Sequence, residues 1–153
     1  MKRINCFKFS VEDATSDKSI ISSIVNISKD NEIVFALYTN RYNIKHINKN
    51  FAVLPTYMAK YANEPMLCWD IISVNLVSNF PGPQKIIYLL EGIIWEKSSN
   101  TSYKTWSKIF DNPRINILTT NKEHQEILKL TWGRESTLVT TSEEVKNALS
   151  KFV

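Results

Sequence analysis

The residues 85–100, KIIYLLEGIIWEKSSN, carry the side chains that are best suited to chemistry. An apolar run ends at Glu91, and Trp95 and Glu96 follow it closely. A positioned carboxylate can deprotonate a hydroxyl nucleophile, and an indole ring can stack on a sugar ring or a nucleobase. We interpret Glu91 and Glu96 as candidate catalytic carboxylates and Trp95 as a candidate ligand-binding residue. In the structural alternative, Glu96 pairs with Lys97 and Trp95 covers the edge of a sheet.

Four further candidates for ligand binding come from other polar segments. Thr120 and Asn121 offer a hydroxyl and an amide, which hydrogen-bond well to polyols, although Thr and Asn are also frequent helix caps. His124 lies in the first turn of an expected helix, where it could contact an anion at the helix N-terminus or simply be solvated. Arg41 belongs to a basic loop that could touch phosphate or remain a solvated loop.

The motifs that the sequence lacks exclude several common sites. The chain has three glycines and contains neither a G-x-G-x-x-G turn nor a G-x-x-x-x-G-K-[ST] loop, which excludes the usual NAD and ATP sites. It has no Asp-x-Asp pair for a divalent ion and no G-x-S-x-G nucleophile motif. The two cysteines and two histidines lack metal-ligand spacing. We therefore predict neither a metal nor a cofactor, and the sequence leaves open whether the chain is an enzyme.

Length and composition predict one globular domain over residues 1–153, since 43% of the residues are hydrophobic and 22% are charged. No apolar run is long enough to span a bilayer and no apolar block follows the basic N-terminal residues, so we expect no membrane association and a cytoplasmic location. The net charge of +4 is mild and the basic residues are spread along the chain, which makes nucleic-acid binding the least favoured function. The abundance of Ile, Asn and Lys suggests an AT-rich genome, such as that of many bacteriophages.

Apolar runs and helical periodicity alternate along the chain. Strands are predicted at 3–9, 32–38, 68–74, 85–90, 115–119 and 137–140. Helices are predicted at 16–31, 55–64, 102–110, 121–132 and 142–152, with a loop at 39–51. The expected helix caps are Thr15 or Ser16, a Thr120–Glu123 capping box, a Thr141–Glu144 capping box and Gly133 at a C-terminus. The third helix should bury one face, made by Tyr103, Trp106, Ile109 and Phe110.

This alternation predicts a single Rossmann-like α/β domain, with a mainly parallel sheet of about six strands and helices on both faces. We expect the segments 32–38, 70–74, 85–90 and 115–119 to form the parallel centre of the sheet. Ligands bind at the carboxyl ends of the strands in such sheets. The residues that follow the strands, Glu91 and Thr120 among them, should therefore form the rim of any site.

The segment from about 70 to 140 resembles the second half of the N-terminal Rossmann domain of two-domain (GT-B type) glycosyltransferases. The resemblance rests on DIISV, KIIYLLE, SYKTWSKIF and INILTTNKEHQEILKLTWG, and YLLEGIIWE is similar to short phage-encoded proteins assigned to that group. It implies an acceptor-binding domain whose rim would include Glu91, Trp95, Thr120 and Asn121.

Two functions follow as hypotheses. The first is a glycosyltransferase-like domain, catalytic or not, that binds a sugar or nucleotide-sugar related ligand at the carboxyl ends of the strands. The second is a non-catalytic phage or bacterial assembly protein, which would bind a protein partner or a second copy of itself. Four Trp, six Tyr and seven Phe suit such an interface if some of them are exposed. A concave pocket on the rim favours the first hypothesis, and a flat aromatic patch favours the second.

Overall fold

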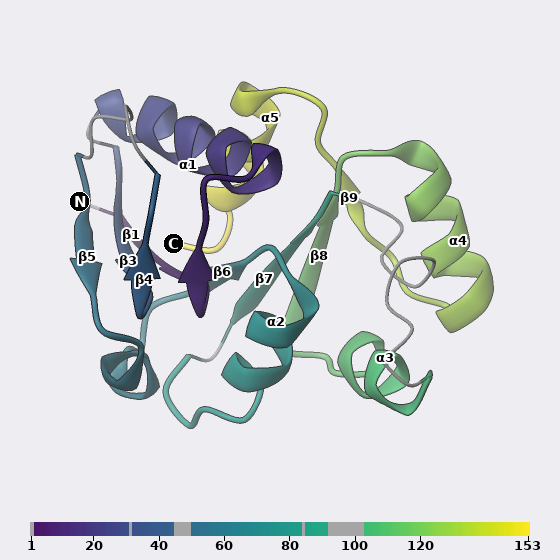
Figure 1. The fold of residues 1–153 in the computed structure, drawn as a ribbon. Coiled ribbons are helices and arrows are strands. Elements are labelled where there is room, and N and C mark those ends of the chain that lie inside the picture. Colours follow the sequence, from purple (N-terminus) through teal and green to yellow (C-terminus); the bar gives the residue numbers. More distant parts are fainter. Residues whose placement is uncertain (1, 31, 45–49, 84, 92–102) are drawn as a thin grey trace.

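A parallel sheet forms the centre of the molecule (Figure 1). The computed structural model describes residues 2–30, 32–44, 50–83, 85–91 and 103–153, so the predicted site residues Trp95 and Glu96 lie outside the described residues. Within that part, seven strands pair in parallel throughout. Across the sheet they run in the order β5 (Ala52–Leu54), β3 (Ile33–Tyr38), β1 (Lys2–Phe7), β6 (Met66–Cys68), β7 (Ile86–Leu90), β8 (Ile115–Thr119) and β9 (Thr137–Leu138).

Helices cover both faces of this sheet, and Figure 1 shows α1 and α5 together on one side of it, with α2 on the other. The first face is covered by α1 (Thr15–Ile27), which continues into the 3-10 turn η1 (Ser28–Asp30), and by α5 (Ser142–Leu149). The second face is covered by η2 (Thr56–Tyr61), α2 (Ile71–Val77), α3 (Tyr103–Phe110) and α4 (Lys122–Trp132). The predicted α/β class, with a mainly parallel sheet and helices on both faces, is confirmed.

The alternation of side chains along the central strands builds two cores. In β7, Ile87 and Leu89 pack on the α1 and α5 side, whereas Ile86, Tyr88 and Leu90 pack on the opposite side. Strand β7 is apolar at consecutive positions because both of its faces are buried. Among the described residues, no helix is long and apolar enough to cross a membrane.

The prediction of a strand at 68–74 is wrong beyond Cys68. Strand β6 ends at Cys68, and α2 begins at Ile71 with Asp70 as its N-cap. The carboxylate of Asp70 accepts hydrogen bonds from the backbone N–H of Ser73 at 2.9 Å and from its hydroxyl at 2.6 Å. This cap turns the apolar residues that follow into a helix, which buries Val74 and Val77 against the sheet. The segment 70–74 is therefore not part of the parallel centre.

Several helix ends and strand ends also differ from the prediction. The predicted loop at 39–51 contains the two-residue strand β4 (Arg41–Tyr42), which pairs with β2 (Ser10–Val11), and the edge strand β5 follows it directly. The N-cap of α1 is Ala14, which has no capping side chain, so the predicted Thr15 or Ser16 cap is wrong. The predicted Thr120–Glu123 box is also wrong, because the side chain of Asn121 caps α4.

Two predicted helix signals are confirmed. Thr141 and Glu144 form a complete capping box at the start of α5, in which each side chain bonds the backbone N–H of the other residue. Gly133 ends α4 in the left-handed conformation at φ 62°, which glycine adopts without strain.

Candidate functional site

The strand order creates a topological switch point between β1 and β6. The chain builds the sheet outward from β1 through β3 to β5, then returns to the other side of β1 and continues from β6 to β9. Crossovers on the two sides of such a point diverge, which leaves a crevice at the carboxyl ends of the two strands, and this is where doubly wound proteins bind ligands. The residues at this place are Lys8, which follows β1, and Trp69 and Asp70, which follow β6.

An ion network joins these residues to the first turn of α1. The ammonium of Lys8 lies 3.1 Å from Oδ1 of Asp17 and 3.6 Å from Oδ2 of Asp70. Asp17 also accepts hydrogen bonds from Nε1 of Trp69 and from the backbone N–H of Glu12, both at 2.8 Å. Only 3% of Asp17 is exposed, so its side-chain oxygens are bonded by these donors rather than by water. The network ties the two sides of the switch point together.

A pocket of about 250 Å³ lies beside this network, between α1 and α5. We call it the α1/α5 pocket. Its floor includes the apolar side chains of Leu67 from β6 and Leu89 from β7. Its polar lining is mostly hydroxyls, contributed by Ser19, Ser23, Thr120, Thr140, Thr141 and Ser142. Among the described residues that line it, Glu91 carries the single ionisable side chain.

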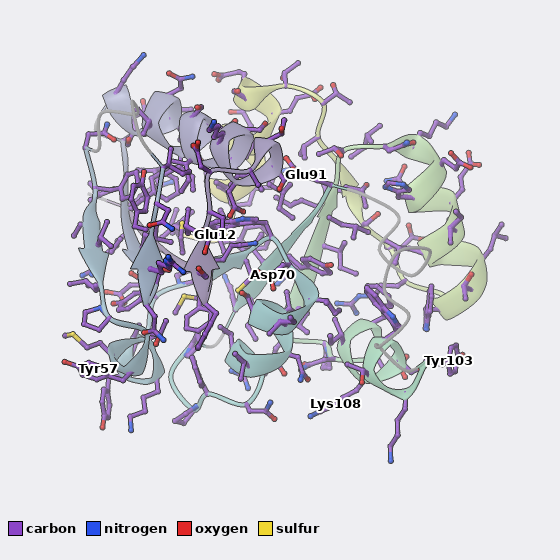
Figure 2. All side chains as sticks on the ribbon, viewed as in Figure 1. Glu12, Tyr57, Asp70, Glu91, Tyr103 and Lys108 are labelled. Atoms are coloured by element: carbon purple, nitrogen blue, oxygen red, sulfur yellow. The ribbon has the colours of Figure 1, made fainter. Side chains whose placement is uncertain are left out.

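Glu91 follows β7 directly and stands at the mouth of the pocket. In Figure 2 it lies beside α1, in the same central region as Glu12 and Asp70, which come from different segments of the chain. Its side chain reaches solvent, but its neighbours remove part of its hydration. Burial, and to a smaller extent the negative charge of Asp17, raise the pKa of the Glu91 carboxyl above its ordinary value. A carboxyl with a raised pKa in a concave site is suited to exchange protons with a ligand.

The structure brings two of the predicted site residues together in the pocket, Glu91 and Thr120. The other three described candidates are not among the residues that line it. Asn121 accepts a hydrogen bond from the backbone N–H of Glu123 at 2.8 Å and caps α4. Arg41 is exposed in β4.

His124 lies inside the molecule rather than at an open helix end. Only 4% of the residue is exposed, and α4 buries it together with Leu128. Its Nδ1 atom has no hydrogen-bond partner among the described residues.

Sequence reasoning missed the residues of the ion network. Asp70 had a local signal, because Asp-x-x-Ser before an apolar run is a helix-capping pattern. Lys8 and Asp17 had none, since they meet only when α1 folds back over the sheet.

In the part of the chain that the structure describes, no group of three or more His, Cys, Asp or Glu side chains is placed to hold a metal ion. Cys6 and Cys68 are free and buried, and burial raises the pKa of both thiols. Comparison with known proteins finds no family that matches this chain and no curated protein with significant similarity to it.

Proposed function

We propose that this chain is a glycosyltransferase-like, acceptor-binding domain that holds a sugar-like ligand in the α1/α5 pocket, with Glu91 in contact with a ligand hydroxyl. One observation carries the proposal. A carboxyl group whose pKa is raised stands at the mouth of a hydroxyl-lined pocket, next to the switch point of a doubly wound sheet. Each of these features is found at ligand sites, and here they coincide.

The chemistry of the pocket wall supports a polyol as the ligand. Ser and Thr hydroxyls both donate and accept hydrogen bonds, as sugar hydroxyls do. The apolar floor, which includes Leu67 and Leu89, suits the C–H face of a sugar ring. At about 250 Å³, the pocket is smaller than the roughly 300–1,000 Å³ of sites for drug-sized ligands, so it suits a ligand of monosaccharide size.

Glu91 would act on this ligand as a hydrogen-bond acceptor and as a proton acceptor. A carboxylate with a raised pKa is a stronger base than an ordinary glutamate, and it can take the proton of a hydroxyl group that attacks an activated donor. Because Glu91 directly follows a fully buried strand, its backbone position is fixed, which a working carboxylate requires.

The test is a thermal-shift screen with simple glycans, nucleotide-sugars and nucleotides, followed by titration of any hit. We expect a saccharide to raise the melting temperature of the wild type progressively with its concentration, because binding at a hundred times the Kd stabilises the folded protein by about 2.7 kcal/mol. Glu91→Gln should lose most of this response. Glu126→Gln, which makes the same charge change on an exposed part of α4, should keep it.

A screen in which no saccharide stabilises the protein would contradict the proposal. So would a saccharide whose effect is equal in the wild type and in Glu91→Gln.

The assembly-protein hypothesis is supported by exposed aromatic side chains, but those of the described residues do not all lie on one surface. Tyr57 and Tyr61 are exposed on η2, and Tyr103 is exposed on α3. Figure 2 shows Tyr57 and Tyr103 at opposite ends of the molecule. A protein interface needs a contiguous patch, so the pocket is the better supported site.

A further inference from the structure

Carboxylates of the chain itself occupy the N-terminal end of α5, which forms one wall of the α1/α5 pocket. In doubly wound proteins, phosphate groups bind where the free backbone N–H groups of a helix N-terminus point at the ligand. Here Oε2 of Glu144 accepts hydrogen bonds from the backbone N–H groups of Thr140 at 2.6 Å and Thr141 at 3.2 Å. It also accepts one from the Thr140 hydroxyl at 2.8 Å. These donors are therefore already used.

Carboxylates also accept backbone hydrogen bonds beside the two helices that flank the switch point. Asp17, in the first turn of α1, accepts from the backbone N–H of Glu12, from Trp69 and from Lys8. Asp70 accepts from the backbone N–H of Ser73 at the start of α2. A carboxylate therefore lies at the N-terminal end of α1, α2 and α5, and at α2 it accepts from a backbone N–H of the helix itself.

Cations near the pocket are also compensated. Lys8 lies between two aspartates at the switch point. On the two helices that form the pocket walls, Lys18 pairs with Asp13 and Lys146 pairs with Glu32, each at 2.9 Å. Among the described lining residues there is no Lys or Arg to oppose the charge of Glu91. The described lining therefore presents hydroxyls and the negative charge of Glu91.

We propose that the α1/α5 pocket selects its ligand by charge, binding an amine-bearing sugar best, its neutral parent less tightly and its phosphorylated form least. The proposal rests on the proposed function, since it assumes a sugar-like ligand. A ligand ammonium would be attracted to the Glu91 carboxylate. A phosphate would be repelled by Glu91 and by Glu144, and it would find the backbone N–H groups of Thr140 and Thr141, just before α5, already bonded. A nucleotide-sugar is accordingly not the ligand of this pocket.

The experiment is an NMR titration of the full chain with glucosamine, glucose and glucose 6-phosphate at about pH 7 and low salt. We expect glucosamine to bind about three- to tenfold tighter than glucose, and glucose 6-phosphate at least about tenfold more weakly than glucose. The differences should shrink at about 1 M salt, where the screening length falls to about 3 Å.

Two variants of α5 distinguish the effect of the bonded N–H groups on phosphate binding from the effect of negative charge alone. Glu144→Ala frees the N–H groups of Thr140 and Thr141, whereas Glu143→Ala removes a neighbouring charge that has no part in the capping box. We expect glucose 6-phosphate to bind several-fold tighter to Glu144→Ala than to Glu143→Ala, with glucose unchanged in both.

Each result decides something. Tightest binding of glucose 6-phosphate to the wild type, or an equal response of the two variants, would overturn the charge selection and leave the proposed function in place. If none of the three sugars binds, both proposals fail. The ranking measured on the wild type does not depend on the variants, so it holds even if α5 frays without Glu144.

Discussion

At the scale of single residues, Glu91 and Asp17 show two uses of a buried or half-buried carboxylate. Asp17 has donors on both oxygens and supports the fold at the switch point. Glu91 is partly desolvated and lies close enough to Asp17 for that charge to raise the pKa of Glu91. Among the described residues no hydrogen bond or ion pair offsets this desolvation, which is consistent with the proposed role of Glu91 in ligand binding.

The raised pKa of Glu91 predicts how stability depends on pH. The folded protein binds this proton more tightly than the unfolded chain, so stability falls as the pH rises from the ordinary glutamate pKa through the raised one. Glu91→Gln removes the ionisation. It should be at least as stable as the wild type at about pH 7, and its advantage should shrink as the pH falls through the raised pKa and be gone below about 4.3.

Urea unfolding at a series of pH values measures this difference, and Glu126→Gln should follow the wild type throughout. A clear loss of stability in Glu91→Gln at neutral pH would mean that the carboxylate is a structural partner.

Local signals in the sequence identified two residues of the pocket but did not identify the contacts of the ion network. Glu91 and Thr120 were predicted because each follows an apolar strand, and the carboxyl ends of neighbouring parallel strands must converge. The contact of Lys8 with Asp17 and Asp70 depends on how α1 and α2 dock on the sheet. No spacing in the chain encodes that docking.

At the scale of elements, the sequence predicted those segments in which periodicity and end signals agree. The segments 85–90 and 115–119 are strands within one residue of the prediction. The segment 68–74 failed because a short apolar run is compatible with a strand and with a buried helix turn. The capping carboxylate of Asp70 decides between the two, since it bonds the backbone N–H that a strand would offer to its neighbour.

Helix α3 allows a matched test of its buried face. Trp106 is 3% exposed and its ring stacks on Phe110 with centroids 5.6 Å apart, whereas Tyr103, which was predicted on the same buried face, is 69% exposed. Trp106→Ala should lower the free energy of unfolding by about 3–5 kcal/mol. Tyr103→Ala should cost less than about 1 kcal/mol, because it loses little beyond its stacking on Trp132. Equal losses in denaturant unfolding would show that α3 is turned differently on the sheet.

At the scale of the whole molecule, the switch point is where the two halves of the sheet are held together. Strands β1 and β6 share only a short register, in which Asn5 pairs with Met66 and Cys6 pairs with Leu67. The network of Lys8, Asp17 and Asp70 bridges the same two halves just beyond the carboxyl ends of these strands. The pocket lies beside this junction, so its walls are set by elements from both halves.

Amide hydrogen exchange should be slowest in the centre of the sheet and faster toward its edges. Strand β7 pairs with β6 on one side and β8 on the other and is buried along its whole length, so the amides of Ile86–Leu90 should exchange among the slowest in the protein. The amides of β5 and β9, which are short and lie at the two edges, should exchange faster. Native-state exchange followed by NMR gives this ordering residue by residue. Fast exchange throughout β7 would contradict its central place, and with it the carboxyl-end position of Glu91 on which the proposed site depends.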